Sequence, residues 1–226
     1  MKLKAENIAK KFPRQREGAN FFYALRETDF TLCEGELKVI TGRSGGGKTT
    51  LLNILGGLLS PSQGKVCIDD TDLYAISDKE LSRFRNCHIA VIPQSAGAIY
   101  TLNVEENILL PTMMYAKRTQ ENIGKAQELM ERFDILDLRE AMPSELSGGE
   151  LRRMAIARAL MTDPDFILAD EPTGDLDDEN TREVLGLLRK KANDGAGVLI
   201  ISHDPEAIPY ADEVLRMDGG VLKSVN

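Results

Sequence analysis

Residues 42–49 read GRSGGGKT and have the residue types and spacing of a phosphate-binding loop. The segment fits the pattern G-x-x-x-x-G-K-[ST], follows a strand-like run and opens a helical pattern, which is the context this motif requires. Glycines let consecutive backbone N–H groups converge on phosphate oxygens, and a helix start adds its positive dipole end. We expect Lys48 to reach the β- and γ-phosphates of a nucleotide and the Thr49 hydroxyl to coordinate Mg²⁺.

The alternative for this segment is an accidental glycine turn, and the flanking strand and helix patterns argue against it. Arg43 occupies a variable position of the motif, so whether it contacts phosphate stays open. The nucleotide-binding residues predicted in the loop are Gly42, Arg43, Ser44, Gly45, Gly46, Gly47, Lys48, Thr49 and Thr50.

Two carboxylates follow the apolar run at 166–169, where the chain reads FILADE. In open α/β sheets, ligands bind at the carboxyl ends of the strands. Asp170 is therefore expected to hold Mg²⁺, directly or through water, and Glu171 to orient and deprotonate an attacking water. Taken alone, an apolar run ending in two acids is a common strand-to-loop boundary. The glycine loop in the same chain favours the chemical interpretation.

The stretch LSGGE at 146–150 predicts a second helix start. Ser147 and Glu150 form the S-x-x-E pattern of a capping box, which does not require Gly148 and Gly149. Glycine inside a helix costs up to ~1 kcal/mol per residue relative to alanine, but it allows a ligand to approach the backbone closely. Free N–H groups at such a helix start bind anions, and the helix carries further positive charge from Arg152, Arg153 and Arg158.

The elements that must position these residues are short strands alternating with helices. Strand patterns cover 37–41, 66–69, 88–92, 166–169 and 198–201, a helix is expected from 48 to about 59, and 103–160 is mostly helical. Unbroken apolar runs suit strands that are buried on both faces of a parallel sheet. We therefore predict an α/β fold: a P-loop NTPase core with a mainly parallel sheet, a small N-terminal antiparallel β subdomain and an inserted α-helical subdomain.

The predicted organisation is a single domain over 1–226. Its β-rich portion covers 1–35 and 62–74, and its core covers 36–61, 75–95 and 161–226. The helical subdomain covers 96–160.

The combination of LSGGE, the glycine–lysine loop and the acidic strand end resembles the ATP-binding-cassette (ABC) ATPases over nearly the whole chain. The resemblance implies ATP and Mg²⁺ as cofactors and a head-to-tail pair of cassettes that sandwiches two nucleotides. In such a pair Ser147, Gly148 and Gly149 would bind the γ-phosphate of ATP held by the other cassette.

The same resemblance implies roles for residues that carry little signal alone. Gln94 matches the glutamine that touches Mg²⁺ and the attacking water and relays the state of the site to a membrane partner. His203 matches a histidine that contacts the γ-phosphate. Asp177 lies in a loop that crosses to the other cassette, and Asp175 is an unusual acid in that loop. By itself, Gln94 is typical of a turn and His203 of a solvated loop.

An aromatic ring is implied beside adenine, and Phe12 is preferred to Tyr23 for this stacking. The alternative is that Phe12 only packs against the β-rich portion. Residues 113–115, MMY, form an apolar cluster that is typical of a core, although methionine-rich surfaces also mark adaptable docking sites. The family resemblance implies that a helix of a membrane protein docks near this insert. His88 is interpreted as structural.

Composition narrows the classes of partner. The net charge is −8 with no basic face, which argues against nucleic acid. Cys33, Cys67 and Cys87 are scattered and predict neither a disulfide framework nor a zinc site. The N-terminus has no signal-peptide pattern, and the apolar run at 51–59 is too short to span a bilayer. We expect a cytoplasmic protein that associates peripherally with the inner face of the cell membrane.

The sequences of these motifs resemble those of a bacterial branch of the ABC family that serves lipoprotein release, macrolide and peptide export, and cell division. It implies an ATPase that dimerises on ATP, as a homodimer, and drives a separate integral membrane permease. A cassette that signals to a membrane-bound cell-wall regulator is the alternative. A P-loop kinase or GTPase does not explain LSGGE or His203. Chromosome and repair ATPases would need a long coiled coil between Gln94 and Leu146.

Overall fold

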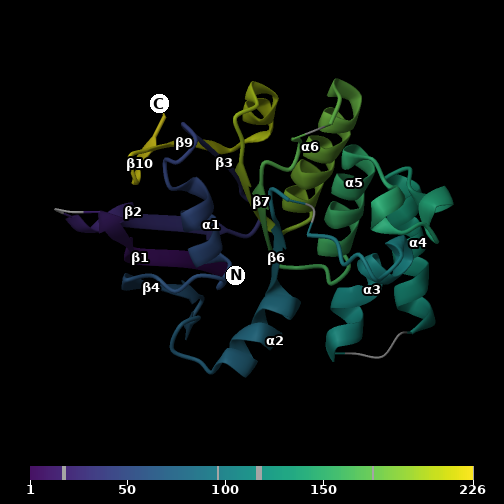
Figure 1. Ribbon diagram of the computed structural model, residues 1–226, viewed down its shortest axis with the longest axis horizontal. Helices are drawn as coiled ribbons and strands as arrows, with labels where there is room; N and C mark the ends of the chain where they lie inside the picture. The colour runs from purple at the N-terminus through teal and green to yellow at the C-terminus, as the bar shows by residue number, and fades with distance from the viewer. Residues whose placement is uncertain (17–18, 96, 116–118, 175, 226) are drawn as a thin grey trace.

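The computed structural model describes residues 1–226 except 17–18, 96, 116–118, 175 and 226. Figure 1 shows two sheets on one side of the molecule and a group of helices on the other. The strand order is β2-β1-β4-β5 in one sheet and β10-β9-β3-β8-β7-β6 in the other. The predicted α/β fold class is confirmed, since antiparallel and mainly parallel sheets occur together with helices.

The smaller sheet is antiparallel throughout its described pairings. Its strands alternate between buried apolar and exposed polar residues, as one-sided burial requires. Leu3 and Ala5 are buried, whereas the alternate residues Lys2 and Lys4 are exposed. The strands are β1 (Lys2–Arg16), β2 (Ala19–Cys33), β4 (Gln63–Ile68) and β5 (Thr71–Asp72).

The larger sheet is parallel from β9 through β6, and β10 adds an antiparallel edge. Every residue of β7 and β8, two neighbouring strands inside this sheet, is buried. Phe166 and Leu168 of β7 pack into one hydrophobic cluster with α1, while Ile167 and Ala169 pack into the other with α5 and α6. The strands are β3 (Leu37–Thr41), β6 (Ile89–Ile92), β7 (Phe166–Asp170), β8 (Gly197–Ile201), β9 (Glu213–Asp218) and β10 (Val221–Ser224).

Helices cover the larger sheet and form the insert. Those of the core are α1 (Lys48–Leu55), α2 (Asp78–His88), α6 (Asp178–Asn193) and the 3₁₀ turn η3 (Pro205–Tyr210). The insert consists of α3 (Val104–Tyr115), α4 (Gln120–Arg132), the 3₁₀ turns η1 (Leu136–Leu138) and η2 (Pro143–Glu145), and α5 (Gly148–Ala159). Helix α5 packs on α3 and α4 of the insert and also on β6 of the core sheet, so it joins the insert to the core.

Predicted element boundaries differ from the structure at several places, and the strand expected over 66–69 spans Gln63–Ile68. The helix expected to reach residue 59 ends at Leu55, because Gly56 caps it and Gly57 adopts a left-handed conformation with φ +67°. His88 is the last residue of α2 and not the first of a strand. Its Nδ1 lies 2.6 Å from Oδ2 of Asp165, which ties the end of α2 to the loop before β7.

Candidate functional site

The phosphate-binding loop connects the end of β3 to the start of α1, and its glycines are required by close packing. Gly47 has φ +104°, and a Cβ there would lie 2.2 Å from the backbone oxygen of Ala24. Gly42 has φ +137°, and a Cβ there would lie 2.1 Å from the backbone oxygen of Met217. Side chains at these positions would collide with β2 and β9, so the loop's shape depends on glycine.

Lys48 is folded back over this loop. Its Nζ donates to the carbonyl oxygens of Gly42 at 2.7 Å and Arg43 at 3.1 Å, and its side chain is buried. Burial lowers the pKa of the Lys48 ammonium, and the negative charges of Glu171 and Asp170 partly oppose this effect. The site therefore holds a desolvated cation that the negative charge of a phosphate would stabilise.

Thr49 and Asp170 meet at the carboxyl end of β7. The Thr49 hydroxyl donates to Oδ2 of Asp170 at 2.6 Å, and Asp170 is only 3% exposed. Hydroxyl and carboxylate oxygens are the ligands that Mg²⁺ prefers, and Mg²⁺ is usually bound by one or two protein groups together with phosphates. Among the described residues no group of three or more His, Cys, Asp or Glu could hold a metal ion alone. This pair therefore fits a magnesium ion that a nucleotide shares.

Glu171 is held in an unusual backbone conformation next to His203. It has φ +49°, a left-handed value that costs a non-glycine residue on the order of 1–3 kcal/mol. Its N–H still donates to the Ile201 carbonyl at 2.9 Å. Its Oε2 accepts from the His203 backbone N–H at 3.2 Å, and its Oε1 lies 3.3 Å from Nε2 of that ring. The same Nε2 lies 3.2 Å from Lys48 Nζ, so the His203 ring contacts both Lys48 and Glu171.

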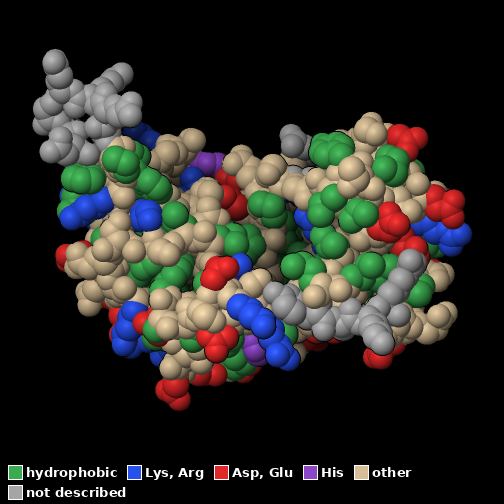
Figure 2. Space-filling model, turned by 60° about the horizontal axis from the view of Figure 1, so that its bottom comes forward, with side chains coloured by type: hydrophobic (Ala, Val, Ile, Leu, Met, Phe, Trp, Pro, Cys, Tyr) green, Lys and Arg blue, Asp and Glu red, His purple; other side chains and the backbone are tan. Residues whose placement is uncertain are grey.

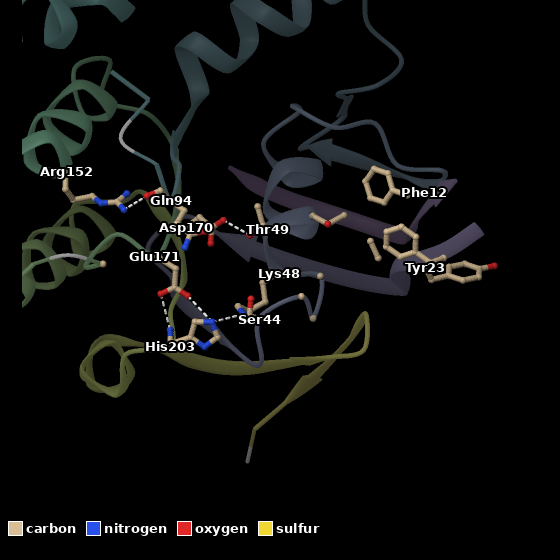
Figure 3. A pocket seen from close by; sticks show the side chains of 17 residues that line it. Phe12, Tyr23, Ser44, Lys48, Thr49, Gln94, Arg152, Asp170, Glu171 and His203 are labelled. Atoms are coloured by element: carbon tan, nitrogen blue, oxygen red, sulfur yellow. Dashed lines mark hydrogen bonds and ion pairs between the residues drawn. The ribbon is translucent and has the colours of Figure 1, made fainter. Parts of the chain in front are cut away.

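A pocket of about 670 Å³ collects most of the predicted nucleotide and catalytic residues. In Figure 3, Lys48 and Thr49 lie between the aromatic residues at one end and the pair Glu171–His203 at the other. Gly42 and Arg43 are not part of the described lining, although Lys48 binds their carbonyl groups. The lining residues are Phe12, Phe22, Tyr23, Ala24, Ser44, Gly45, Gly46, Gly47, Lys48, Thr49, Thr50, Gln94, Arg152, Asp170, Glu171, Gly174 and His203.

The aromatic end of the pocket contains three rings on β1 and β2. Phe12 is half-buried and stacks on Phe22, with ring centroids 5.7 Å apart and an interplanar angle of 29°. Tyr23 is 46% exposed and also lines the pocket. Sequence reasoning missed Phe22, which faces Phe12 through the β1–β2 register. The preference for Phe12 over Tyr23 as the stacking ring stays a prediction.

Gln94 follows β6, and Arg152 binds its backbone. From the sequence, Arg152 was expected only to add positive charge along the helix. Arg152 of α5 is only 4% exposed, and its guanidinium donates to the Pro93 carbonyl at 2.6 Å and to the Gln94 carbonyl. The side chain of Gln94 is exposed and reaches the pocket. Figure 3 shows this contact on the same side of the pocket as Glu171.

The start of α5 has the capping box that the sequence predicts. Ser147 Oγ accepts from the Glu150 N–H at 3.3 Å, and the Glu150 carboxylate accepts from the Ser147 N–H at 2.6 Å. The hydrogen bond from the Ser147 side chain lowers the pKa of Glu150. Ser147 and Gly148 are exposed, and residues 147–149 lie outside the described lining of the pocket. The second helix start and the phosphate loop are thus not brought together within one chain.

Asp177 is the N-cap of α6. Its Oδ1 accepts from the Asn180 N–H at 2.9 Å, and this hydrogen bond lowers the pKa of the Asp177 carboxyl. The side chain is exposed, so a second partner can reach it. Asp175 lies outside the described residues.

The apolar cluster predicted near the insert is at the surface. Met113 is 47% and Met114 is 58% exposed, so neither is a core residue; the side chain of Tyr115 lies outside those described. Met114 lines a groove of about 370 Å³ whose walls are α2 and β6 on one side and α3 and α5 on the other. Figure 2 shows a face on which apolar side chains gather between the sheet-bearing part and the helical part. Within the described ranges, every helix is too short or too polar to span a bilayer.

Comparison with known proteins agrees with this geometry. A protein-family profile described as ABC transporter matches residues 25–174. The chain is 38% identical over 200 residues to the ABC transporter ATP-binding protein YtrE of Bacillus subtilis, which covers 88% of this chain and 87% of that protein. It is 36% identical over 221 residues to the lipoprotein-releasing system ATP-binding protein LolD of Buchnera aphidicola, with 97% and 95% of the two chains covered.

A solved structure matches nearly the whole chain. The dimeric post-hydrolysis state of the ATP-binding cassette MJ0796, bound to ADP and Pi, has a TM-score of 0.91 at 31% identity and covers 99% of both chains. The resemblance drawn from the sequence motifs is confirmed by these matches. Similarity of this extent, in motif, sequence and structure together, means that the chain belongs to the ABC transporter family and is an ATP-binding, ATP-hydrolysing cassette.

Proposed function

We propose that this chain drives a separate membrane permease from the inner face of the cell membrane, and that it hydrolyses ATP at a seam between two copies. The observation that carries the proposal is the separation of two phosphate-binding features. Lys48, Thr49 and Glu171 lie in one pocket, whereas residues 147–149 present an exposed helix start outside it. Free N–H groups at a helix start bind anions. In a second copy docked head to tail, the ATP bound to the phosphate loop would place its γ-phosphate at this helix start.

In this arrangement the phosphate loop binds ATP through its backbone N–H groups and Lys48. Thr49 and Asp170 would hold Mg²⁺, and the ion would supply positive charge beside the phosphates. Phe12 stacks on the adenine ring.

Glu171 accepts a proton from the attacking water. The left-handed backbone of Glu171 and its two contacts with His203 support this role, because they fix the carboxylate beside the phosphate loop. Gln94 orients the water, and His203 donates a hydrogen bond to the γ-phosphate. Ser147, Gly148 and Gly149 of the second copy bind the same phosphate from the other side. Asp177 makes contact across the seam.

For the permease, we propose docking in the groove between α2–β6 and α3–α5. The exposed Met114 at its wall supports this site, because methionine packs adaptably against a partner helix. Similarity to LolD, a lipoprotein-releasing system protein, favours export or extraction, and the proposed cargo is a lipoprotein, peptide or drug. Co-purification from membranes tests this proposal directly. Recovery of a cell-wall regulator and no permease would show that the chain serves signalling and not transport.

The seam is tested with Glu171→Gln, which keeps the shape of the side chain but removes its capacity to accept a proton. We expect this variant to bind ATP without hydrolysing it and to accumulate as a dimer, whereas the parent chain returns to monomer after turnover. Light scattering coupled to size exclusion, with ATP and with ADP, measures the mass. Full turnover by the variant would refute the role of Glu171.

A further inference from the structure

We propose that Arg152 is a positioning residue that ties the start of α5 to Gln94, so that phosphate binding at residues 147–149 sets the orientation of Gln94 in the same chain. The inference rests on the proposed function, since it assigns a means of communication between the two halves of that site. Its structural basis is a buried cation that bridges two segments far apart in the sequence.

The first observation is the contact itself. Arg152 Nη1 donates to the Pro93 carbonyl at 2.6 Å, and its Nη2 donates to the Gln94 carbonyl. The residue is only 4% exposed. A guanidinium presents several donors in a rigid fork, and one that is buried is costly unless those donors find acceptors. The two carbonyl groups of residues 93–94 therefore have a fixed place relative to α5.

The second observation is where Arg152 sits on the helix. It lies four residues after Gly148, one turn into α5, and long helical side chains lean toward the N-terminus of their helix. A Cβ on Gly174 would lie 3.9 Å from Arg152 Nη2, so the guanidinium also borders the loop that follows Glu171. Arg152 thus lies between the glutamine and the loop after the catalytic acid, and it lines the nucleotide pocket with both.

A second arginine of the same helix holds the far end of the segment. Arg158 Nη1 donates to the Gly97 carbonyl at 2.9 Å. Both ends of the described part of 93–97 are consequently bonded to α5. Because α5 is a continuous helix, a small displacement of its start on binding the second copy's nucleotide would shift the backbone of Gln94 with it.

The experiment is a double-mutant cycle on ATP hydrolysis with Arg152→Met and Gln94→Ala. We expect Arg152→Met to lower kcat on the order of 10- to 100-fold, the effect of misplacing a group by about an ångström. Magnesium-free ATP affinity should stay within about twofold, because the phosphate loop is untouched. In the Gln94→Ala background, Arg152→Met should lower kcat less than about twofold further, since its effect acts through Gln94.

Arg189→Met is the matched control. Arg189 also donates to backbone carbonyls, those of Tyr210 and Gly35 at 3.3 Å each, but it lies away from the pocket. It should lower thermal stability without lowering kcat. An equal loss of kcat from Arg152→Met with and without Gln94, or the same loss from Arg189→Met, would overturn the proposal and leave Arg152 a purely structural residue.

Hydrogen exchange separates this inference from the proposed function. Amides within 93–97 should exchange faster in Arg152→Met than in the parent chain, and this comparison requires no turnover. Unchanged exchange of these amides would refute the role of Arg152 and leave the proposed ATPase function intact. A parent chain that does not hydrolyse ATP would instead refute the proposed function, and the exchange result would still decide whether Arg152 holds the segment.

Discussion

Replacing Thr49 with valine removes the hydroxyl that pairs with Asp170 while keeping the shape of the side chain. In the free protein this hydroxyl donates to Asp170 at 2.6 Å, and Asp170 is 3% exposed. A hydrogen bond to a charged group contributes about 1.5–3 kcal/mol, and the exposure of Thr49 places this one at the lower end. The loss of about 1.5 kcal/mol should lower Tm by about 3–6 °C for a chain of this size.

The second consequence of Thr49→Val concerns magnesium. Because the phosphate loop and Lys48 remain, calorimetry with EDTA should give ATP affinity close to that of the parent chain. With Mg²⁺ the affinity should be at least about tenfold weaker, because one metal ligand is missing. Thr49→Ser keeps the hydroxyl and serves as the control, with both quantities near the parent values. An unchanged Tm, or an equal loss of affinity with and without Mg²⁺, would show that Thr49 and Asp170 do not act as a pair.

Three further predictions concern the pocket. Burial holds the pKa of Lys48 below the ordinary lysine value of 10.5, and the charged form binds phosphate; ATP affinity should therefore fall with rising pH before 10.5 is reached. Lys48→Arg should remove this dependence in calorimetry across that range. Phe12→Ala should weaken the affinity for ATP more than the affinity for inorganic triphosphate, which has no base to stack on the ring. A larger loss of ATP affinity from Tyr23→Ala would assign the stacking to Tyr23 instead. Gly45→Ala should destabilise the fold by about 1–3 kcal/mol in urea, because Gly45 has φ +74° but open space around its Cβ. Gly47→Ala should cost more, because its φ is +104° and its Cβ would in addition lie 2.2 Å from a backbone oxygen.

Local patterns in the sequence predicted the phosphate loop, the acidic strand end and the capping box, because each is built from neighbouring residues. The strand predicted at 37–41 has those bounds in the structure. Helix α2 was missed although Ser77 and Glu80 repeat the capping pattern of Ser147 and Glu150. Its weak apolar character hid it, since Leu81 is its one buried residue among those described.

Contacts between distant segments could not be predicted in the same way. The sequence assigned Arg152 only to positive charge along the helix, whereas in the structure it is buried and donates to a segment 59 residues away. The pairing of Phe12 with Phe22 required the register of β1 and β2, which bulges interrupt at several places. Sequence periodicity describes one element at a time, so such contacts appear only when the elements are assembled.

The central claim is that each active site combines the phosphate loop of one chain with the α5 start of another. Mixing two inactive variants tests it most directly: Glu171→Gln, which has an intact α5 start, and Gly148→Asp, which has an intact Glu171. Each variant alone lacks a complete site. In an equal mixture about half of the dimers are mixed and each contains one complete site, so hydrolysis should return to about a quarter of the parent rate. A mixture no more active than its two components, or a Gly148→Asp chain that hydrolyses ATP normally alone, would contradict the claim.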